Sequence, residues 1–238
     1  MRLRPRIFML ILGIETSGST GGVAVWENGK LLGERTLSNR GRRHAQVLVA
    51  ESAELLEALG RTPSECRGVA VSVGPGSFTG LRIGVGFAKT FAYSVGCPVT
   101  AVETMQAIAE EAPEGVTSLS VIADAQRGDL YVGRYAKSDE AWHREGSIAM
   151  HPALGWCRNV NAAETVAGPA LERFENELSD RCRVLPGLRV PEVETICRIG
   201  ERQLNAGLFA DLWALEPYYL RRSSAEEQWD LRHKSGTA

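Results

Sequence analysis

A long, largely apolar stretch runs from Val69 to Val95, and its hydrophobic pattern divides it into three parts. Val69 to Val73 is a short apolar run with β-branched valines, which predicts a buried strand. Residues 74–76 (Gly-Pro-Gly) are a turn signal. From Ser77 to Val95 almost every helical face is apolar, which predicts a buried helix rather than a surface helix.

Small residues recur at every fourth position of this predicted helix, at Gly80, Gly84, Ala88 and Ala92. Residues four apart share one face of a helix, so these four form a stripe. A glycine inside a helix costs about 1 kcal/mol relative to alanine. Gly84 and Gly86 therefore indicate that another element approaches the helix backbone closely. That element could be the sheet of the same domain or a helix of another chain, and both can hold because a helix has two sides.

The sequence before this stretch predicts three antiparallel strands followed by a helix. The strands are expected at residues 7–15, 23–26 and 31–37, with a hairpin turn at Asn28-Gly29. Apolar positions at helical spacing predict a helix over 44–59. After Val95 the pattern predicts a strand at 97–102 and a helix at 103–111.

A second round of the same pattern begins near residue 119. A strand over 119–124 ends at Asp124, as the first strand ends at Glu15, and further strands are expected at 130–135 and 141–150. The segment TVAGPAL (165–171) then echoes the strand, Gly-Pro and helix of VSVGPGSFTGL. The helices expected here cover 170–178, shorter and more polar than its counterpart, and 195–205. This order indicates an internal duplication of an α/β unit.

Two such units, each opening with a hairpin whose first strand ends in an acid, are typical of actin-like and hexokinase-like (ribonuclease H-like) proteins. In that architecture a nucleotide lies between the halves, although fold alone does not give function. We therefore predict an α/β fold of two subdomains, residues 7–105 and 106–222, the second one degenerate. Residues 217–222 are expected to dock on the fold as a tail, and residues 1–6 and 223–238 are expected to be disordered tails.

Composition narrows the classes of function. The net charge is −2 with 24% charged residues, which gives no global electrostatic footprint for nucleic acid or membrane. The five cysteines form no C-x-x-C motif, as expected for reduced thiols in a cytoplasmic protein. The basic and apolar start resembles a signal peptide, but its apolar run over 7–12 is short and no cleavage site follows. No segment is long enough to span a bilayer.

The glycine turn and the start of the long helix could hold an anion, because backbone N–H groups and the positive end of the helix dipole meet there. The residues of this candidate anion or nucleotide remnant are Glu15, Thr16, Ser17, Gly74, Gly76, Ser77, Thr79 and Asp124. The alternative, which we favour, is a tight turn without ligand, with each acid capping its own hairpin. GPGSFTGLR lacks the Lys-Ser/Thr pair of a Walker loop.

Other chemistry has weaker support. His44, His143, His151 and His233 lie far apart, so we predict no metal site. GPGSFTG is not the G-x-S-x-G nucleophile pattern, which disfavours a protease. A basic loop could contact tRNA phosphates or an acidic partner, or could simply be solvated, and the sequence does not separate these. Its cations are Arg40, Arg42 and Arg43.

Five motifs together resemble the bacterial TsaB family, formerly grouped with glycoproteases. They are ILGIETS, RRHAQ, GPGSFTGLRIGVGFAK, DAQRGDLYVGRY and P-Y-Y-L-R, and they span residue 11 to about residue 221. The resemblance implies a role in making N6-threonylcarbamoyladenosine at position 37 of tRNA. In that system TsaD is the catalytic subunit, TsaE is a small ATPase that joins the pair, and TsaC makes threonylcarbamoyl-adenylate. Glu15 stands where the family usually has Asp.

The resemblance further implies a non-catalytic scaffold that activates TsaD, pairs with itself when alone, and binds no cofactor as an isolated chain. Whether ATP or ADP sits at the junction with TsaD stays open. The expected partner surface consists of His44, Val47, Leu48, Glu51, Leu55, Gly80, Arg82, Gly84, Ala88 and Ala92. The alternative is an ATP-dependent small-molecule kinase of the same superfamily, although VAGPALE is a poor second phosphate loop.

Overall fold

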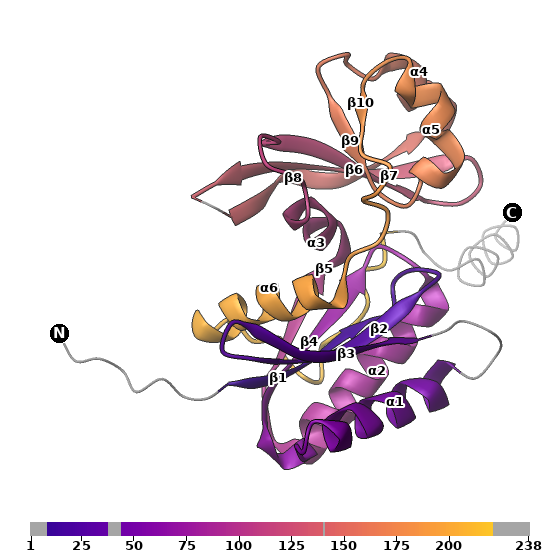
Figure 1. Ribbon diagram of the computed structural model, residues 1–238. Helices are drawn as coiled ribbons and strands as arrows, with labels where there is room; N and C mark the ends of the chain where they lie inside the picture. Colours follow the sequence, from indigo (N-terminus) through magenta and orange to yellow (C-terminus); the bar gives the residue numbers. More distant parts are fainter. Residues whose placement is uncertain (1–8, 38–43, 140, 221–238) are drawn as a thin grey trace, which may run out of the picture.

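Two five-stranded sheets, each built from one half of the chain, form the framework of the molecule (Figure 1). The structure is a computed structural model that describes residues 9–37, 44–139 and 141–220. The first sheet has the order β3-β2-β1-β4-β5. Its strands are β1 (Leu10–Glu15), β2 (Gly21–Glu27), β3 (Lys30–Leu37), β4 (Cys66–Gly74) and β5 (Val99–Glu103).

The second sheet repeats this plan. Its order is β10-β9-β6-β7-β8, and its strands are β6 (Ser118–Asp124), β7 (Asp129–Ser138), β8 (Ala141–Pro152), β9 (Thr165–Ala167) and β10 (Arg183–Val184). β6 pairs antiparallel with β7 and parallel with β9, as β1 does with β2 and β4. Gly74 and Gly168, each followed by proline, have φ angles of 110° and 113°. The predicted duplication and the predicted fold class are confirmed.

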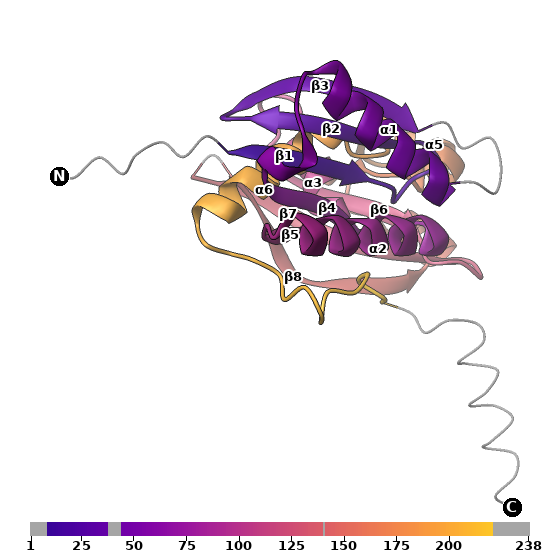
Figure 2. The same cartoon turned by 90° about the horizontal axis from the view of Figure 1, so that it is seen from below.

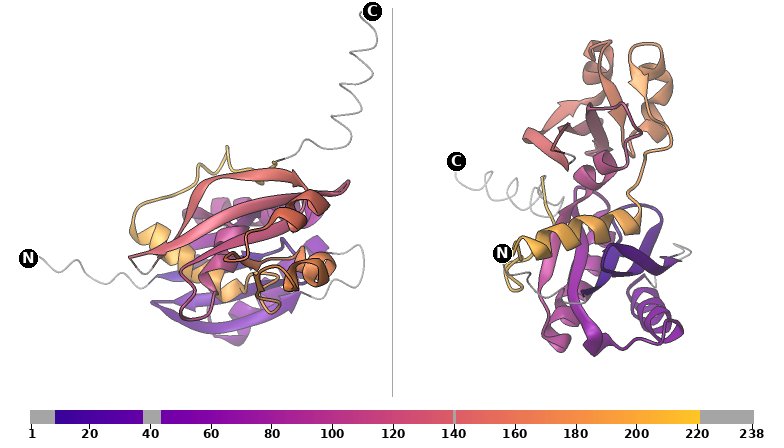
Figure 3. Two further views of the ribbon diagram at one scale, coloured as in Figure 1. Left: turned by 90° about the horizontal axis from the view of Figure 1, so that it is seen from above. Right: turned by 60° about the vertical axis from the view of Figure 1, so that its left-hand side comes forward.

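Helices cover both faces of each sheet. Figure 2 shows α1 (His44–Ala58) and α2 (Phe78–Val95) side by side on one face of the first sheet, and α6 (Val193–Asn205) lies on the other face (Figures 1 and 3). α4 (Ala153–Asn159) and α5 (Leu171–Ser179) pack on the second sheet, and α3 (Thr104–Glu110) lies between the two halves. Because β1 is covered on both sides, all six of its residues are buried.

The last helix returns to the first sheet, so the halves are not simply the sequence ranges 7–105 and 106–222. Ile196 and Ile199 of α6 are buried against that sheet. The approach is close because both partners are small. A Cβ at Gly200 would lie 2.3 Å from the Ala70 Cβ, and a Cβ at Gly13 would lie 2.2 Å from the Cys197 Sγ.

Polar contacts join the two halves around α3. Glu103, at the end of β5, accepts hydrogen bonds from the Tyr135 hydroxyl and from Arg144 of the second sheet. Burial raises the pKa of the Glu103 carboxyl and of the Tyr135 hydroxyl. Glu110 of α3 pairs with Arg198 and Arg202 of α6, at 3.0 and 2.5 Å. These contacts hold α3 against both halves.

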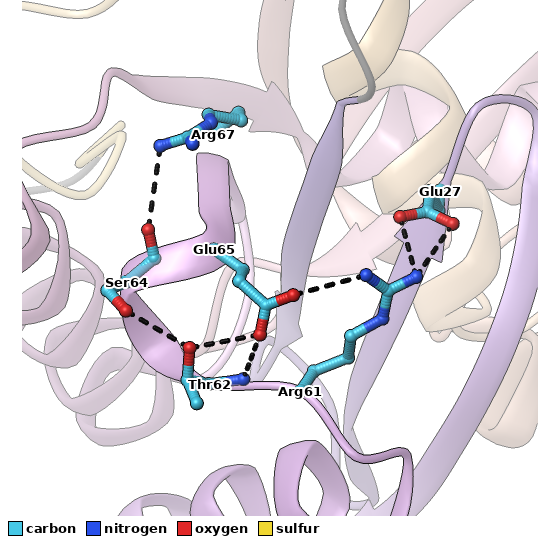
Figure 4. Close-up of polar contacts among 6 residues, drawn as sticks. All are labelled: Glu27, Arg61, Thr62, Ser64, Glu65 and Arg67. Carbon is cyan, nitrogen blue, oxygen red and sulfur yellow. Dashed lines mark hydrogen bonds and ion pairs between the residues drawn. The ribbon is translucent and has the colours of Figure 1, made fainter.

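A second polar cluster holds the entry to β4 (Figure 4). Arg61 donates to both carboxylate oxygens of Glu27 on β2, at 2.9 and 3.0 Å, and to Glu65 at 3.2 Å. Glu65 in turn accepts the Thr62 backbone N–H at 2.7 Å, which caps the short 3₁₀ turn Pro63–Glu65. The start of the central β4 strand is thereby tied to β2.

The predicted strands and helices are present among the described residues, with boundaries shifted by a few residues. The structure also contains three elements that the sequence did not predict, namely α4, β10 and the 3₁₀ turn. Each is too short to show a hydrophobic period. Residues 1–6, 223–238 and the basic loop with Arg40, Arg42 and Arg43 lie outside the described residues. No helix in the described part of the chain is long and apolar enough to cross a membrane.

Candidate functional site

The start of α2 carries the glycine motif that the sequence singled out. Ser77 caps the helix, because its hydroxyl accepts the Gly80 N–H at 3.2 Å. Thr79 lies within the helix and is exposed. Gly74 ends β4 with a φ of 110°, a backbone conformation that favours glycine.

The hairpin turn after β1 lies directly on this helix start. The Ser77 N–H donates to the Ser17 carbonyl at 2.7 Å. A Cβ at Gly76 would lie 2.5 Å from the same carbonyl oxygen, and a Cβ at Gly80 would lie 2.0 Å from the carbonyl oxygen of Thr16. These two glycines of GPGSFTG therefore make room for the backbone of the chain's own turn, at the place where an anion was considered.

The small-residue stripe faces inward. Gly84, Ala88 and Ala92 are buried, and a Cβ at Gly84 would lie 2.2 Å from the Thr16 Oγ1. The prediction that this stripe forms a partner surface is wrong, because its close neighbours are β1 and the turn that follows β1. Gly86 differs, since it is exposed and a Cβ there would meet no atom within 4 Å.

The α1 residues that were predicted to form the partner surface are likewise partly buried and partly accessible. Leu48 and Leu55 are buried in the core of the first sheet, so their assignment to a partner surface is also wrong. Val47 is half-buried, and Glu51 lies 3.9 Å from Arg35 of β3. The side chain of His44 lies outside the described residues. Arg82 on α2 is exposed, as a partner contact requires.

The Glu15 side chain binds the turn of its own hairpin. The side chain is almost completely buried, and its Oε1 accepts the Ser17 backbone N–H and the Ser17 hydroxyl, both at 2.5 Å. Burial raises the pKa of the Glu15 carboxyl, and the hydrogen bonds from Ser17 only partly oppose this. This geometry is the one expected of a capping carboxylate.

Asp124 repeats this arrangement at the corresponding end of β6. Its Oδ1 accepts the Gln126 backbone N–H at 2.7 Å, so this acid also caps the turn that follows its strand. Unlike Glu15, Asp124 is exposed. The structure thus brings Glu15, Thr16 and Ser17 together with the start of α2, and leaves Asp124 within its own turn. The described residues contain no cluster of three or more His, Cys, Asp or Glu side chains that could hold a metal ion.

The C-terminal strap (residues 206–220) runs beside α2, on the flank away from α1 (Figure 2). The Tyr218 N–H donates to the Val73 carbonyl at 2.6 Å, and Ala210 binds the edge strand at Val99 at 2.9 Å. Tyr219 packs on Phe78, with ring centroids 5.2 Å apart. The sequence predicted docking for residues 217–222 only, and it did not predict the aromatic partners, for which P-Y-Y-L-R was the available signal.

Comparisons with known proteins agree with the motifs. Residues 30–200 match the family described as "TsaD: tRNA N6-adenosine threonylcarbamoyltransferase". An Escherichia coli (strain K12) protein named "tRNA threonylcarbamoyladenosine biosynthesis protein TsaB" is 31% identical over 145 residues, which are 60% of this chain and 62% of that protein. The chain thus spans less than two thirds of the length of this relative.

Two further relatives cover more of the chain. "Uncharacterized protein Rv3421c" of Mycobacterium tuberculosis (strain ATCC 25618 / H37Rv) is 30% identical over 225 residues, which are 92% of this chain and 93% of that protein. The solved structure "YeaZ from Pseudomonas aeruginosa" superposes with a TM-score of 0.77 at 25% identity, covering 89% of this chain and 100% of that chain. The similarity therefore extends over both halves of the fold.

Proposed function

Because the chain belongs to the TsaD family and is related to its TsaB proteins, we propose that it is a non-catalytic partner of the TsaD subunit in the synthesis of N6-threonylcarbamoyladenosine on tRNA. TsaE is the proposed third component, and the chain acts in the cytoplasm. ATP or ADP, if bound, belongs to the junction with TsaD rather than to this chain alone.

One observation supports the non-catalytic role most directly. The carbonyl groups of Thr16 and Ser17 occupy the space in front of Gly76 and Gly80, where an active relative of this architecture could place a phosphate. Glu15, the acid at this site, is buried and engaged by Ser17. Only Oε1 is engaged, and Oε2 is buried without a hydrogen-bond partner within the described residues, so it is burial that keeps this carboxylate away from a substrate or a nucleophile.

The surface proposed for TsaD is the outer face of α2, opposite the buried stripe. Thr79, Ile83, Gly86 and Thr90 follow one another at helical spacing on this face. Thr79, Gly86 and Thr90 are exposed, and Ile83 is half-exposed. Because nothing lies within 4 Å of a Cβ at Gly86, a partner helix can approach the α2 backbone there. The close approach of a partner helix, which the sequence analysis assigned to the stripe with Gly84, is therefore assigned to Gly86.

The proposal is tested by adding volume at Gly86. Overpacking costs about 1–3 kcal/mol, so Gly86→Leu should weaken association with TsaD by roughly 5- to 150-fold in calorimetry. Ala58→Leu, at an exposed position near the end of α1, is the matched control. Neither variant should unfold below the wild-type temperature, because both positions are open to solvent and leucine is a good helix former. Wild-type affinity of Gly86→Leu for TsaD would reject this surface, and no association of the wild-type chain with TsaD would reject the function itself.

A further inference from the structure

Exposed aromatic and aliphatic side chains are concentrated on one flank of α2. Ten large apolar side chains are exposed among the described residues, and seven of them belong to α2 or to the C-terminal strap. The seven are Phe78, Tyr93, Leu208, Phe209, Trp213, Tyr218 and Tyr219. Trp213, at 75% exposure, and Tyr93, at 68%, are the most exposed of them. Large exposed apolar side chains gathered on neighbouring segments mark an interaction site.

The rings form two pairs along this flank. Phe78 packs with Tyr219 at one end, with centroids 5.2 Å apart, and Tyr93 meets Trp213 edge-on at the other end, at 5.7 Å. Phe78 and Tyr93 are fifteen positions apart on α2, which corresponds to about 22 Å along the helix axis. Both pairs join a helix residue to a strap residue.

Two cations of α2, Arg82 and Lys89, lie between Phe78 and Tyr93 along the helix. The Arg82 guanidinium stacks on the Phe78 ring, 4.2 Å from its centroid, and its Nε donates to the Tyr219 hydroxyl at 2.8 Å. Within the described residues the terminal amino groups of Arg82 make no hydrogen bond, so its outer edge is free for an anion. Lys89 lies farther along α2, with its Nζ donating to the carbonyls of Trp213 and Leu215 at 3.1 and 3.0 Å.

We propose that this flank, the aromatic–arginine seam (Phe78, Arg82, Tyr93, Trp213 and Tyr219), binds an unpaired segment of RNA. Bases stack on the exposed rings, and a phosphate binds the free edge of the Arg82 guanidinium. The inference rests on the proposed function, which gives the chain an RNA substrate, and extends it by assigning an RNA contact to this chain.

Charge at the Arg82 end suits an anionic ligand such as a phosphate, because Arg82 is exposed and only its Nε donates a hydrogen bond within the described residues. Two acids of the strap, Asp211 and Glu216, oppose this. Asp211 is already engaged, because its Oδ1 accepts the N–H groups of Trp213 and Ala214 at 2.8 and 3.2 Å.

The test uses a fluorescein-labelled oligouridylate and the full chain, with binding followed by fluorescence anisotropy at low and at moderate salt. Trp213→Ala and Tyr219→Ala should each weaken binding by roughly 5- to 150-fold, the range expected for loss of one base–aromatic stack. Arg82→Ala should also weaken binding, and it should reduce the slope of log affinity against log salt concentration by about one. Arg173→Ala is the matched control, since Arg173 is exposed and stacks on Phe174 at 5.2 Å on the far half of the molecule.

The inference is overturned if the wild-type chain does not bind the oligonucleotide, or if the three seam variants bind it as Arg173→Ala does. It is also overturned if the seam variants bind RNA normally but lose association with TsaD, because the seam would then be a protein surface. The two proposals can fail separately. Normal TsaD association by a chain that does not bind RNA rejects only the seam, and RNA binding by a chain that does not associate with TsaD rejects only the proposed function.

Discussion

Gly80 faces the carbonyl oxygen of Thr16 so closely that a Cβ on Gly80 would lie 2.0 Å from that oxygen. The contact joins the first turn of α2 to the hairpin turn after β1. Both partners are backbone, so neither can move aside as a side chain would. The glycine is therefore required by the fold of this chain, and no ligand is needed to explain it.

Two glycines of one helix should respond to alanine in opposite directions. Gly80→Ala should lower the free energy of unfolding by about 1–3 kcal/mol or more, because the new methyl group meets the Thr16 carbonyl. Gly86→Ala should raise it by up to about 1 kcal/mol, because its methyl group meets open space and alanine favours the helix. Urea unfolding of the two variants measures both. Equal effects at the two positions would show that Thr16 does not lie against Gly80.

The pH dependence of stability should contain a contribution from Glu111, which follows α3. Its Oε1 accepts the Glu192 N–H at 2.7 Å, and burial raises the pKa of the carboxyl to about 7. A raised pKa means that the folded state holds the proton more tightly than the unfolded state. The contribution to stability is therefore complete below pH 4.5 and is lost as the pH rises through about 7.

Glu111→Gln removes this titration. Relative to wild type, the variant should gain stability between about pH 5 and pH 8, by at most about 3 kcal/mol. Glu114→Gln is the control, because it removes the same charge from an exposed position nearby. Thermal unfolding at several pH values measures the difference. A Glu111→Gln curve parallel to the wild-type curve would contradict the assignment.

The isolated chain should neither bind ATP tightly nor hydrolyse it. Ser77 and Gly80 donate their N–H groups to the Ser17 carbonyl and to the Ser77 hydroxyl, so part of the anion-binding capacity of α2 is already used. Titration calorimetry with ATP and Mg²⁺ should give no micromolar binding. Micromolar affinity with turnover would instead favour the small-molecule kinase.

The sequence predicted the strands, the main helices and the duplication because each depends on local pattern or on repetition. It could not predict which way the stripe of Gly84, Ala88 and Ala92 faces. Small residues at this spacing suit a partner helix and a neighbouring strand equally well, and only the path of the turn at Thr16 decides between them. Gly84 and Gly86 have the same identity and nearly the same position, yet one is buried and the other is exposed.

The site was predictable in part for a similar reason. Glu15 and Asp124 could be placed at the ends of equivalent strands from the repeat alone. Whether their side chains are buried or exposed could not be predicted, because burial depends on packing by elements distant in sequence. The seam was beyond sequence reasoning, since the contact between Phe78 and Tyr219 joins residues that are remote along the chain.

The most direct measurement of the central claim is threonylcarbamoyl transfer to tRNA in a reaction reconstituted from purified components. With TsaD, TsaE, ATP and threonylcarbamoyl-adenylate supplied, transfer should require this chain, and Gly86→Leu should reduce it in parallel with its loss of TsaD association. This chain with the same substrates but without TsaD should give no product. Transfer by this chain without TsaD, or full transfer by TsaD and TsaE in its absence, would contradict its assignment as a required non-catalytic partner.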